Sequence, residues 1–244
     1  MLIAPGQGHN LGHVRHMAMV SGTVMTETRS LLRLMTWLSP TFPVGGFNYS
    51  HGLEQAVAQC SVTGRESLKD WICVLLSQGS AWNDAVLLAE AWRMATERQD
   101  LTEVSDLAEA LAGSAERHLE TMNQGIAFLA ASRTWPLPVH DELADGVAWP
   151  VAVGAVAGAS ALPLEATLAA FLHAFAANQV QAALRLMSLG QAAGVAVLAE
   201  IESEIGVVAA RAARSTLDDL GSAALNAEIA AMNHETLTSR IFRT

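Results

Sequence analysis

Lysine is almost absent from this 244-residue sequence: Lys69 is the only one, and the other basic residues are arginines. The 14 basic residues are outnumbered by 24 acidic ones, so the formal net charge is -10. A negative field of this size repels phosphate backbones and anionic membrane surfaces, so neither nucleic acid nor a membrane is an expected partner. Arginine makes planar, bidentate contacts with carboxylates. A basic set made almost entirely of arginine therefore favours a role in protein interfaces over catalysis by a lysine side chain.

Cysteine is equally scarce, with Cys60 and Cys73 as the only two. Their separation fits neither a C-x-x-C redox pair nor the paired spacing of zinc ligands. A reducing cytoplasm is therefore the expected location. No metal site is predicted, although the spacing of His9, His13 and His16 would place them on one face of a helix.

Catalytic motifs are missing as well. The sequence has no G-x-x-x-x-G-K-[ST] phosphate loop and no G-x-S-x-G nucleophile elbow. Ser50 and His51 are adjacent, so on a helix their side chains would point about 100° apart and could not act as nucleophile and base. We predict no catalytic residues and no resident cofactor, and we do not expect an enzyme.

One uncharged run, residues 147–164, is long enough to be considered as a membrane span. Pro150, Gly154, Gly158 and Pro163 interrupt it, and much of the remainder is alanine and valine. This composition favours a buried helix of a globular protein over a transmembrane helix.

The sequence contains ample material for a helical core, with 51% hydrophobic residues and alanine-rich stretches that repeat every three to four positions. Strand signals are scarce, so we predict an all-α fold, a single-domain bundle of about nine or ten helices. Pro136 and Pro138 predict a tight loop between helices and not a domain linker. The expected helices include 66–76, 82–98, 117–133, 147–161, 164–187, 192–214 and 218–232.

The two ends of the sequence lack the helical pattern of the segment between them. Residues 1–25 are predicted to be a disordered or cloning-derived extension, since they lack the continuous apolar segment of a signal peptide. Both Met1 and Met25 remain possible natural starts. Residues 26–233 form the predicted helical domain, and residues 234–244 form a polar C-terminal tail.

The most informative stretch is Leu38 to Glu54, LSPTFPVGGFNYSHGLE. Its prolines restrict the backbone and its glycine pair permits a sharp reversal. Phe42, Phe47 and Tyr49 concentrate here, although only 5% of the residues are aromatic. Such rings either fill a corner of a helical bundle or anchor a partner, and both interpretations stay open.

The segment from Ser39 to Glu54 reads S-P-x-F-P-x-G-x-F-x-Y-S-H-G-L-E, which strongly resembles the signature of the urease accessory protein F family. The resemblance extends from about Ser30 to the end of the chain. It continues through Asp70-Trp71, Asn83-Asp84, Asn178-Gln179, Arg185-Leu186, Leu189-Gly190-Gln191, His234-Glu235-Thr236 and Ser239-Arg240-Ile241-Phe242.

The resemblance implies an all-helical, dimeric protein without chemistry of its own. Members of the family work with the D (or H) accessory protein and the G-type GTPase to deliver nickel to apo-urease. Nickel would then be bound only transiently within the assembly. The expected partner-binding residues are Phe42, Tyr49, His51, Glu54, Arg185, Gln191, Ser239, Arg240 and Phe242.

Two alternatives belong to other functional classes. The chain could be a GTPase-activating protein that inserts Arg185 or Arg240 into the partner's active site to stabilise the transition state. A standalone helical enzyme or cofactor-binding protein would instead need an apolar pocket with convergent polar groups, and we can assemble no such set from the sequence.

Overall fold

The computed structural model describes residues 26–143 and 146–243, and every regular element in them is helical, which confirms the all-α prediction. A first helix covers residues 26–37. The elements that follow are η1 (Gly46–Asn48), α2 (Leu53–Ala58), α3 (Arg65–Gln78), α4 (Ser80–Glu97), α5 (Thr102–Ala110), α6 (Ala115–Ser132), α7 (Val139–Glu142), α8 (Trp149–Ala159), α9 (Leu164–Leu186), α10 (Gln191–Ala212), η2 (Leu217–Asp219) and α11 (Leu225–His234). The predicted extension, with its three histidines, lies outside the described residues.

The core is built around the contact between α4 and α8, which is the most extensive between any two helices of the described chain. Two glycines of α8 make this close approach possible. A Cβ atom at Gly154 would lie 2.3 Å from the backbone oxygen of Leu88, and one at Gly158 would lie 2.4 Å from that of Trp92. The glycines that argued against a membrane span are therefore needed for helix packing.

Apolar helices here are core helices. α8 has only 11 residues, and Pro150 lies in its first turn, where a proline is tolerated. Residues 65–97, which include α3 and α4, are long and apolar enough to cross a membrane, but 61% of their most apolar window is buried inside the protein. The sequence-based preference for a buried helix over 147–164 agrees with this arrangement.

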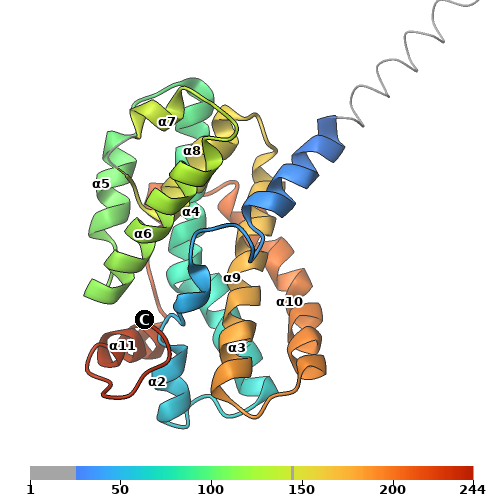
Figure 1. The fold of residues 1–244 in the computed structure, drawn as a ribbon, viewed down its shortest axis with the longest axis vertical. Coiled ribbons are helices and arrows are strands. Elements are labelled where there is room, and N and C mark those ends of the chain that lie inside the picture. Colours follow the sequence, from blue (N-terminus) through green and yellow to red (C-terminus); the bar gives the residue numbers. More distant parts are fainter. Residues whose placement is uncertain (1–25, 144–145, 244) are drawn as a thin grey trace, which may run out of the picture.

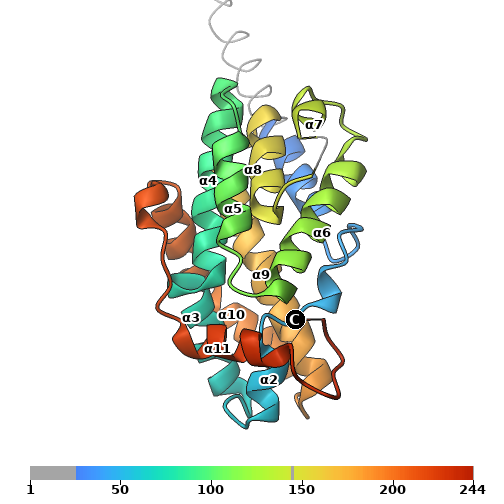
Figure 2. The same ribbon diagram turned by 90° about the vertical axis from the view of Figure 1, so that its left-hand side faces the viewer.

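α9 runs through the middle of the molecule and contacts α10, α4 and α2 (Figure 1). α11 lies across the end of the molecule at which α2 is found, and the C-terminus lies beside it (Figure 2). The helix over 26–37 leans away from the body at the other side of α9 (Figure 1). This topology brings the segment before α2 and the segment after α11 to one place, although they come from opposite ends of the sequence.

The predicted helix over 218–232 is wrong in its first half. The structure has the short η2 there, then an extended segment, and α11 begins only at Leu225. The extended segment is held by two hydrogen bonds to the junction of α3 and α4: Asn83 Oδ1 accepts from the Gly221 amide, and the Gln78 carbonyl accepts from the Ala223 amide. These contacts replace the hydrogen bonds of a helical turn, and no local periodicity in the sequence could reveal them.

Candidate functional site

The loop between the first helix and α2 turns sharply just before α2. His51 and Gly52 both have positive φ, 52° and 78°. Gly52 also lies directly under α11, where a Cβ atom would be 2.7 Å from the Ala231 amide nitrogen. Glycine is therefore required at this position both by its backbone conformation and by the close approach of the last helix.

Glu54, in the first turn of α2, holds the C-terminal tail, which we define as residues 235–243. Its carboxylate accepts hydrogen bonds from the backbone amides of Ile241 at 2.6 Å and Phe242 at 2.9 Å. The same carboxylate lies 3.0 Å from Nε2 of His234. Glu54 and His234 are both buried, so these bonds form out of contact with bulk water.

A second carboxylate completes this cluster. Nδ1 of His234 lies 2.7 Å from Oε2 of Glu116, at the start of α6, and Arg240 of the tail donates to the other oxygen of Glu116. Burial raises the pKa of the Glu54 carboxyl, but the hydrogen bonds from His234, Ile241 and Phe242 outweigh it, so this pKa lies below its ordinary value. Glu54 is therefore a charged acceptor at neutral pH.

Phe242 and Arg243, at the end of the described chain, pack against the loop and α9. Phe242 is buried, and the guanidinium carbon of Arg185 lies 4.3 Å from the centre of its ring. Arg185 also donates to the Phe47 carbonyl at 3.0 Å, and the Arg243 amide donates to the Asn48 carbonyl at 2.8 Å. These contacts join the loop, α9 and the tail to one another.

A separate buried ion network lies next to this cluster. Nε2 of His51 is 2.9 Å from Glu120, whose other oxygen is 2.7 Å from Arg117, and Arg117 reaches Asp84 at 3.5 Å. Burial raises the pKa of Glu120, but Arg117 and His51 outweigh it and hold the pKa at about 2. For Asp84 burial dominates over Arg117, so the pKa is raised. The network fixes the loop to α4 and α6.

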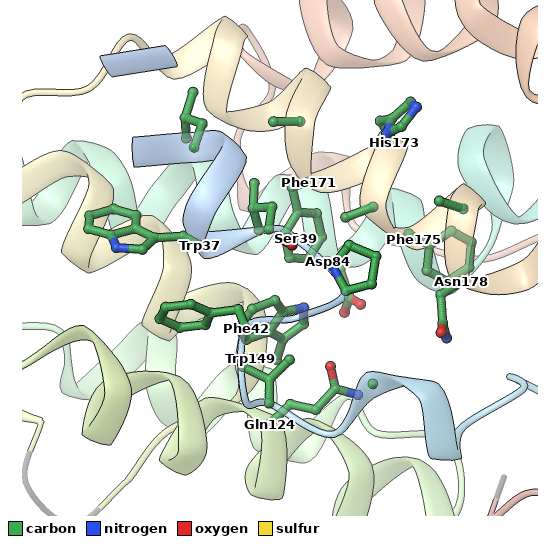
Figure 3. Close-up of a pocket in the computed structure, with 18 of the residues that line it drawn as sticks. Trp37, Ser39, Phe42, Asp84, Gln124, Trp149, Phe171, His173, Phe175 and Asn178 are labelled. Atoms are coloured by element: carbon green, nitrogen blue, oxygen red, sulfur yellow. The ribbon is translucent and has the colours of Figure 1, made fainter. Parts of the chain in front are cut away.

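These charges lie beside a cleft of about 920 Å³ between the first helix, the loop, α6 and α9. Trp37, Phe42 and Trp149 gather at one end of it, and Phe175 and Asn178 lie at the other (Figure 3). The Phe42 ring packs on Phe128 with centroids 5.6 Å apart. Most of the lining is apolar, so the cleft is suited to an apolar side chain or helix more than to a polar metabolite.

The structure brings most of the expected partner-binding residues together. Tyr49, His51, Glu54 and Phe242 are buried and hold the loop and tail in place. The remaining five are partly or fully exposed and come from the loop, the tail, and the end of α9 or start of α10: Phe42, Arg185, Gln191, Ser239 and Arg240. The contacts within the chain do not test whether any of these nine residues touches a partner, so that part stays a prediction.

Sequence reasoning missed the acidic residues Glu116 and Glu120, and the arginine between them, Arg117. In the sequence they are ordinary charged residues in the first two turns of an amphipathic helix, a pattern that is typical of a solvent-facing surface. No local feature of the sequence shows that these side chains lie in the interior. Among the described residues no group of three or more histidine, cysteine or acidic side chains is arranged to hold a metal ion.

Two kinds of comparison, with a family model and with individual proteins, point to the same family. The model of the family described as UreF matches residues 62–202. A protein of Brucella canis with the name "Urease accessory protein UreF 1" is 54% identical over 228 residues, which cover 93% of this chain and 100% of the relative. A protein of Rhizobium leguminosarum bv. viciae with the name "Urease accessory protein UreF" is 56% identical over 218 residues, 89% of this chain and 98% of the relative.

Proposed function

This chain belongs to the UreF family of urease accessory proteins, and we propose that it serves nickel insertion into apo-urease as a scaffold for the other accessory proteins. The family consists of accessory proteins involved in urease maturation and not of enzymes, in agreement with the prediction from the sequence. The proposed partners are a D- or H-type accessory protein, a G-type GTPase and apo-urease. The proposed location is the cytoplasm, and nickel is the cargo of the assembly.

The observation that carries this proposal is the surface that loop and tail form together. Buried Glu54 fixes the backbone of Ile241 and Phe242, so neighbouring side chains of the tail have defined positions on the surface. Phe47 of the loop and Ile241 of the tail are more than half exposed, although both are large and apolar. An ordered surface with exposed aromatic and aliphatic groups beside an arginine is typical of a protein interface.

A homodimer through the first helix is part of the proposal. Leu34 and Trp37 of this helix are buried against the body, whereas Leu31, Leu32 and Met35 are exposed. Leu31 and Met35 also form one wall of the cleft. Since an apolar ridge and an apolar cleft lie side by side on the same molecule, a two-fold axis would let each copy's ridge enter the other's cleft. This arrangement would remove the exposed leucines and methionine from water.

The alternative, a GTPase-activating protein with an arginine finger, is less well supported by the geometry. Arg185 donates to the Phe47 carbonyl and lies on the Phe242 ring, and Arg240 is paired with Glu116. Either arginine would have to leave these contacts to reach a nucleotide. If it does so, the partner's rate of GTP hydrolysis will rise at saturating concentrations of this chain and fall back when Arg185 or Arg240 is replaced by alanine.

Size-exclusion chromatography with light scattering tests the scaffold directly. The chain is measured alone, then with the D-type protein, then with the GTPase and GTP. We expect a dimer that takes up both partners in one complex. A monomer that binds neither partner would contradict the proposal.

A further inference from the structure

Asp84 of α4 is a carboxylate of the cleft that has few partners. Its side chain is only 15% exposed and lies between the two ends of the cleft (Figure 3). Among the described residues its one hydrogen-bond partner is Arg117, and the distance of 3.5 Å is longer than an ordinary hydrogen bond. Arg117 makes its short contact, of 2.7 Å, with Glu120 instead.

The two carboxylates beside Arg117 therefore differ in how well their charges are stabilised. The pKa of Glu120 stays at about 2 in spite of burial, mainly because of this arginine. For Asp84 burial raises the pKa, and the same arginine does not offset it. The other arginine that lines the cleft, Arg185, is already bonded to the loop and stacked on the tail. No arginine that lines the cleft is left to pair closely with Asp84.

Any surface that covers this cleft has to satisfy Asp84. In the dimer proposed above, the apolar ridge of one copy, formed by Leu31, Leu32 and Met35, enters the cleft of the other. Apolar side chains alone would take the remaining water from a carboxylate with a single long contact, and an ionised carboxylate without a partner is costly to bury. The helix that covers the cleft must therefore bring a hydrogen-bond donor, and a positively charged one suits the carboxylate best.

The first helix carries such a donor in Arg29. Arg29 lies three residues before Leu32, so the two side chains are neighbours on the helix. It is exposed and, within the part of the chain that the structure describes, its side chain makes no hydrogen bond or ion pair. The other arginine of the ridge region, Arg33, is engaged in its own copy, because its guanidinium carbon lies 5.6 Å and 5.8 Å from the ring centres of Trp37 and Trp135.

We propose that Arg29 of one copy pairs with Asp84 of the other in the dimer, once on each side of the two-fold axis. An exposed arginine without a partner and a poorly paired carboxylate in an apolar cleft are complementary in charge. Each copy carries a net charge of -10, so two copies repel each other and their contact needs local attraction of this kind. The pair also fixes the register in which the ridge enters the cleft. This inference rests on the proposed dimer and adds the two residues that make the contact specific.

A double-mutant cycle on the dissociation constant of the full-length dimer tests the pair, with light scattering over a dilution series as the measurement. Arg29→Gln and Asp84→Asn should each raise the dissociation constant by about tenfold or more. The double variant should dissociate little more easily than either single variant, because both substitutions remove the same contact. Arg214→Gln replaces an exposed arginine at the end of α10 and should leave the constant unchanged. Thermal unfolding of each variant checks that the fold is kept.

Arg29→Glu provides an independent check. It should weaken the dimer more than Arg29→Gln does, because two carboxylates then meet, and this difference should vanish in the Asp84→Asn background. Effects that simply add in the cycle, or a dimer that is as tight or tighter with Asp84→Asn, would overturn the pair. Dissociation by Met35→Asp would in that case still support the dimer through the first helix, so the two proposals fail separately. A chain that is monomeric at every concentration would overturn both.

Discussion

Glu54 and His234 lie 180 residues apart in the sequence, and their side chains meet at 3.0 Å in the interior of the protein. This single contact joins the first turn of α2 to the end of α11, the helix that precedes the tail. Because each residue also binds a further partner, Glu54 the tail amides and His234 the Glu116 carboxylate, the contact organises the whole candidate surface.

The first prediction concerns the energy of this contact. Glu54→Ala leaves Nε2 of His234 and two backbone amides without their partner, so we expect a loss of about 3 to 5 kcal/mol in the free energy of unfolding, since each buried donor left unpaired costs about 1 to 3 kcal/mol. Glu66→Ala is the matched control, since Glu66 pairs with Lys69 on the exposed surface. It should change stability little, because an exposed ion pair is screened by water. Urea unfolding measures both, and equal losses would contradict the account.

A second prediction uses the pH dependence of stability. The pKa of Glu120 is held at about 2, against an ordinary value of 4.5, so its charged form stabilises the folded state. This contribution is fully present above pH 4.5 and is lost as the pH falls towards 2, and it amounts to roughly 3 kcal/mol at neutral pH. Glu120→Gln should therefore be destabilised at pH 7, and the difference from wild type should shrink by about 1 kcal/mol or more at pH 3.5.

Urea unfolding at both pH values provides the measurement. Glu202→Gln is the control, because Glu202 lies exposed on α10. It should change stability little at either pH. A difference between wild type and Glu120→Gln that does not depend on pH would show that the Glu120 charge is not stabilised as described.

A third prediction tests the packing of α8. Gly154→Ala places a Cβ atom 2.3 Å from the Leu88 carbonyl oxygen, so α4 and α8 must separate. We expect destabilisation of about 1 to 3 kcal/mol or more. Gly206→Ala, in α10, meets nothing within 4 Å and should instead stabilise the helix by about 0.5 to 1 kcal/mol. Thermal unfolding of the two variants should therefore move in opposite directions, and a shift of the same sign in both would contradict this packing.

A fourth prediction concerns the dimer. Met35 on the first helix and Val207 on α10 are each 63% exposed. Met35→Asp should convert the dimer to a monomer in light scattering, since it places a charge on the apolar ridge beside the cleft. Val207→Asp introduces the same charge at an equally exposed apolar position and should remain dimeric. A dimer that survives Met35→Asp and dissociates on Val207→Asp would place the interface on α10.

Local signals were enough to predict the class of the fold. Regular alanine spacing and the absence of strand signals indicated helices, and Gly154 with Gly158 correctly argued for a buried α8. The tail could not be predicted in the same way. Its position depends on Glu116 and Glu54, whose partners are more than a hundred residues away and leave no periodic trace in the sequence.

In the C-terminal part of the chain, composition alone predicted a helix that starts too early. The apolar residues after Asp218 are compatible with one helix, but Gly221 and Ala223 bond to Asn83 and Gln78 of another part of the chain, and α11 starts later. For the loop, the sequence left open whether its aromatic residues fill a corner or anchor a partner. The structure divides them: Tyr49 is buried, and Phe47 is 64% exposed.

The most direct test of the central claim is urease activation in a reconstituted mixture of apo-urease, the accessory proteins, nickel and GTP. Arg240→Ala is compared with Arg65→Ala, because both arginines pair with a glutamate and their side chains are similarly exposed, 41% and 43%. We predict that Arg240→Ala lowers activation at least severalfold while the chain stays folded, and that Arg65→Ala activates like the wild type. Full activation by Arg240→Ala would contradict the claim that the surface formed by loop and tail serves urease maturation.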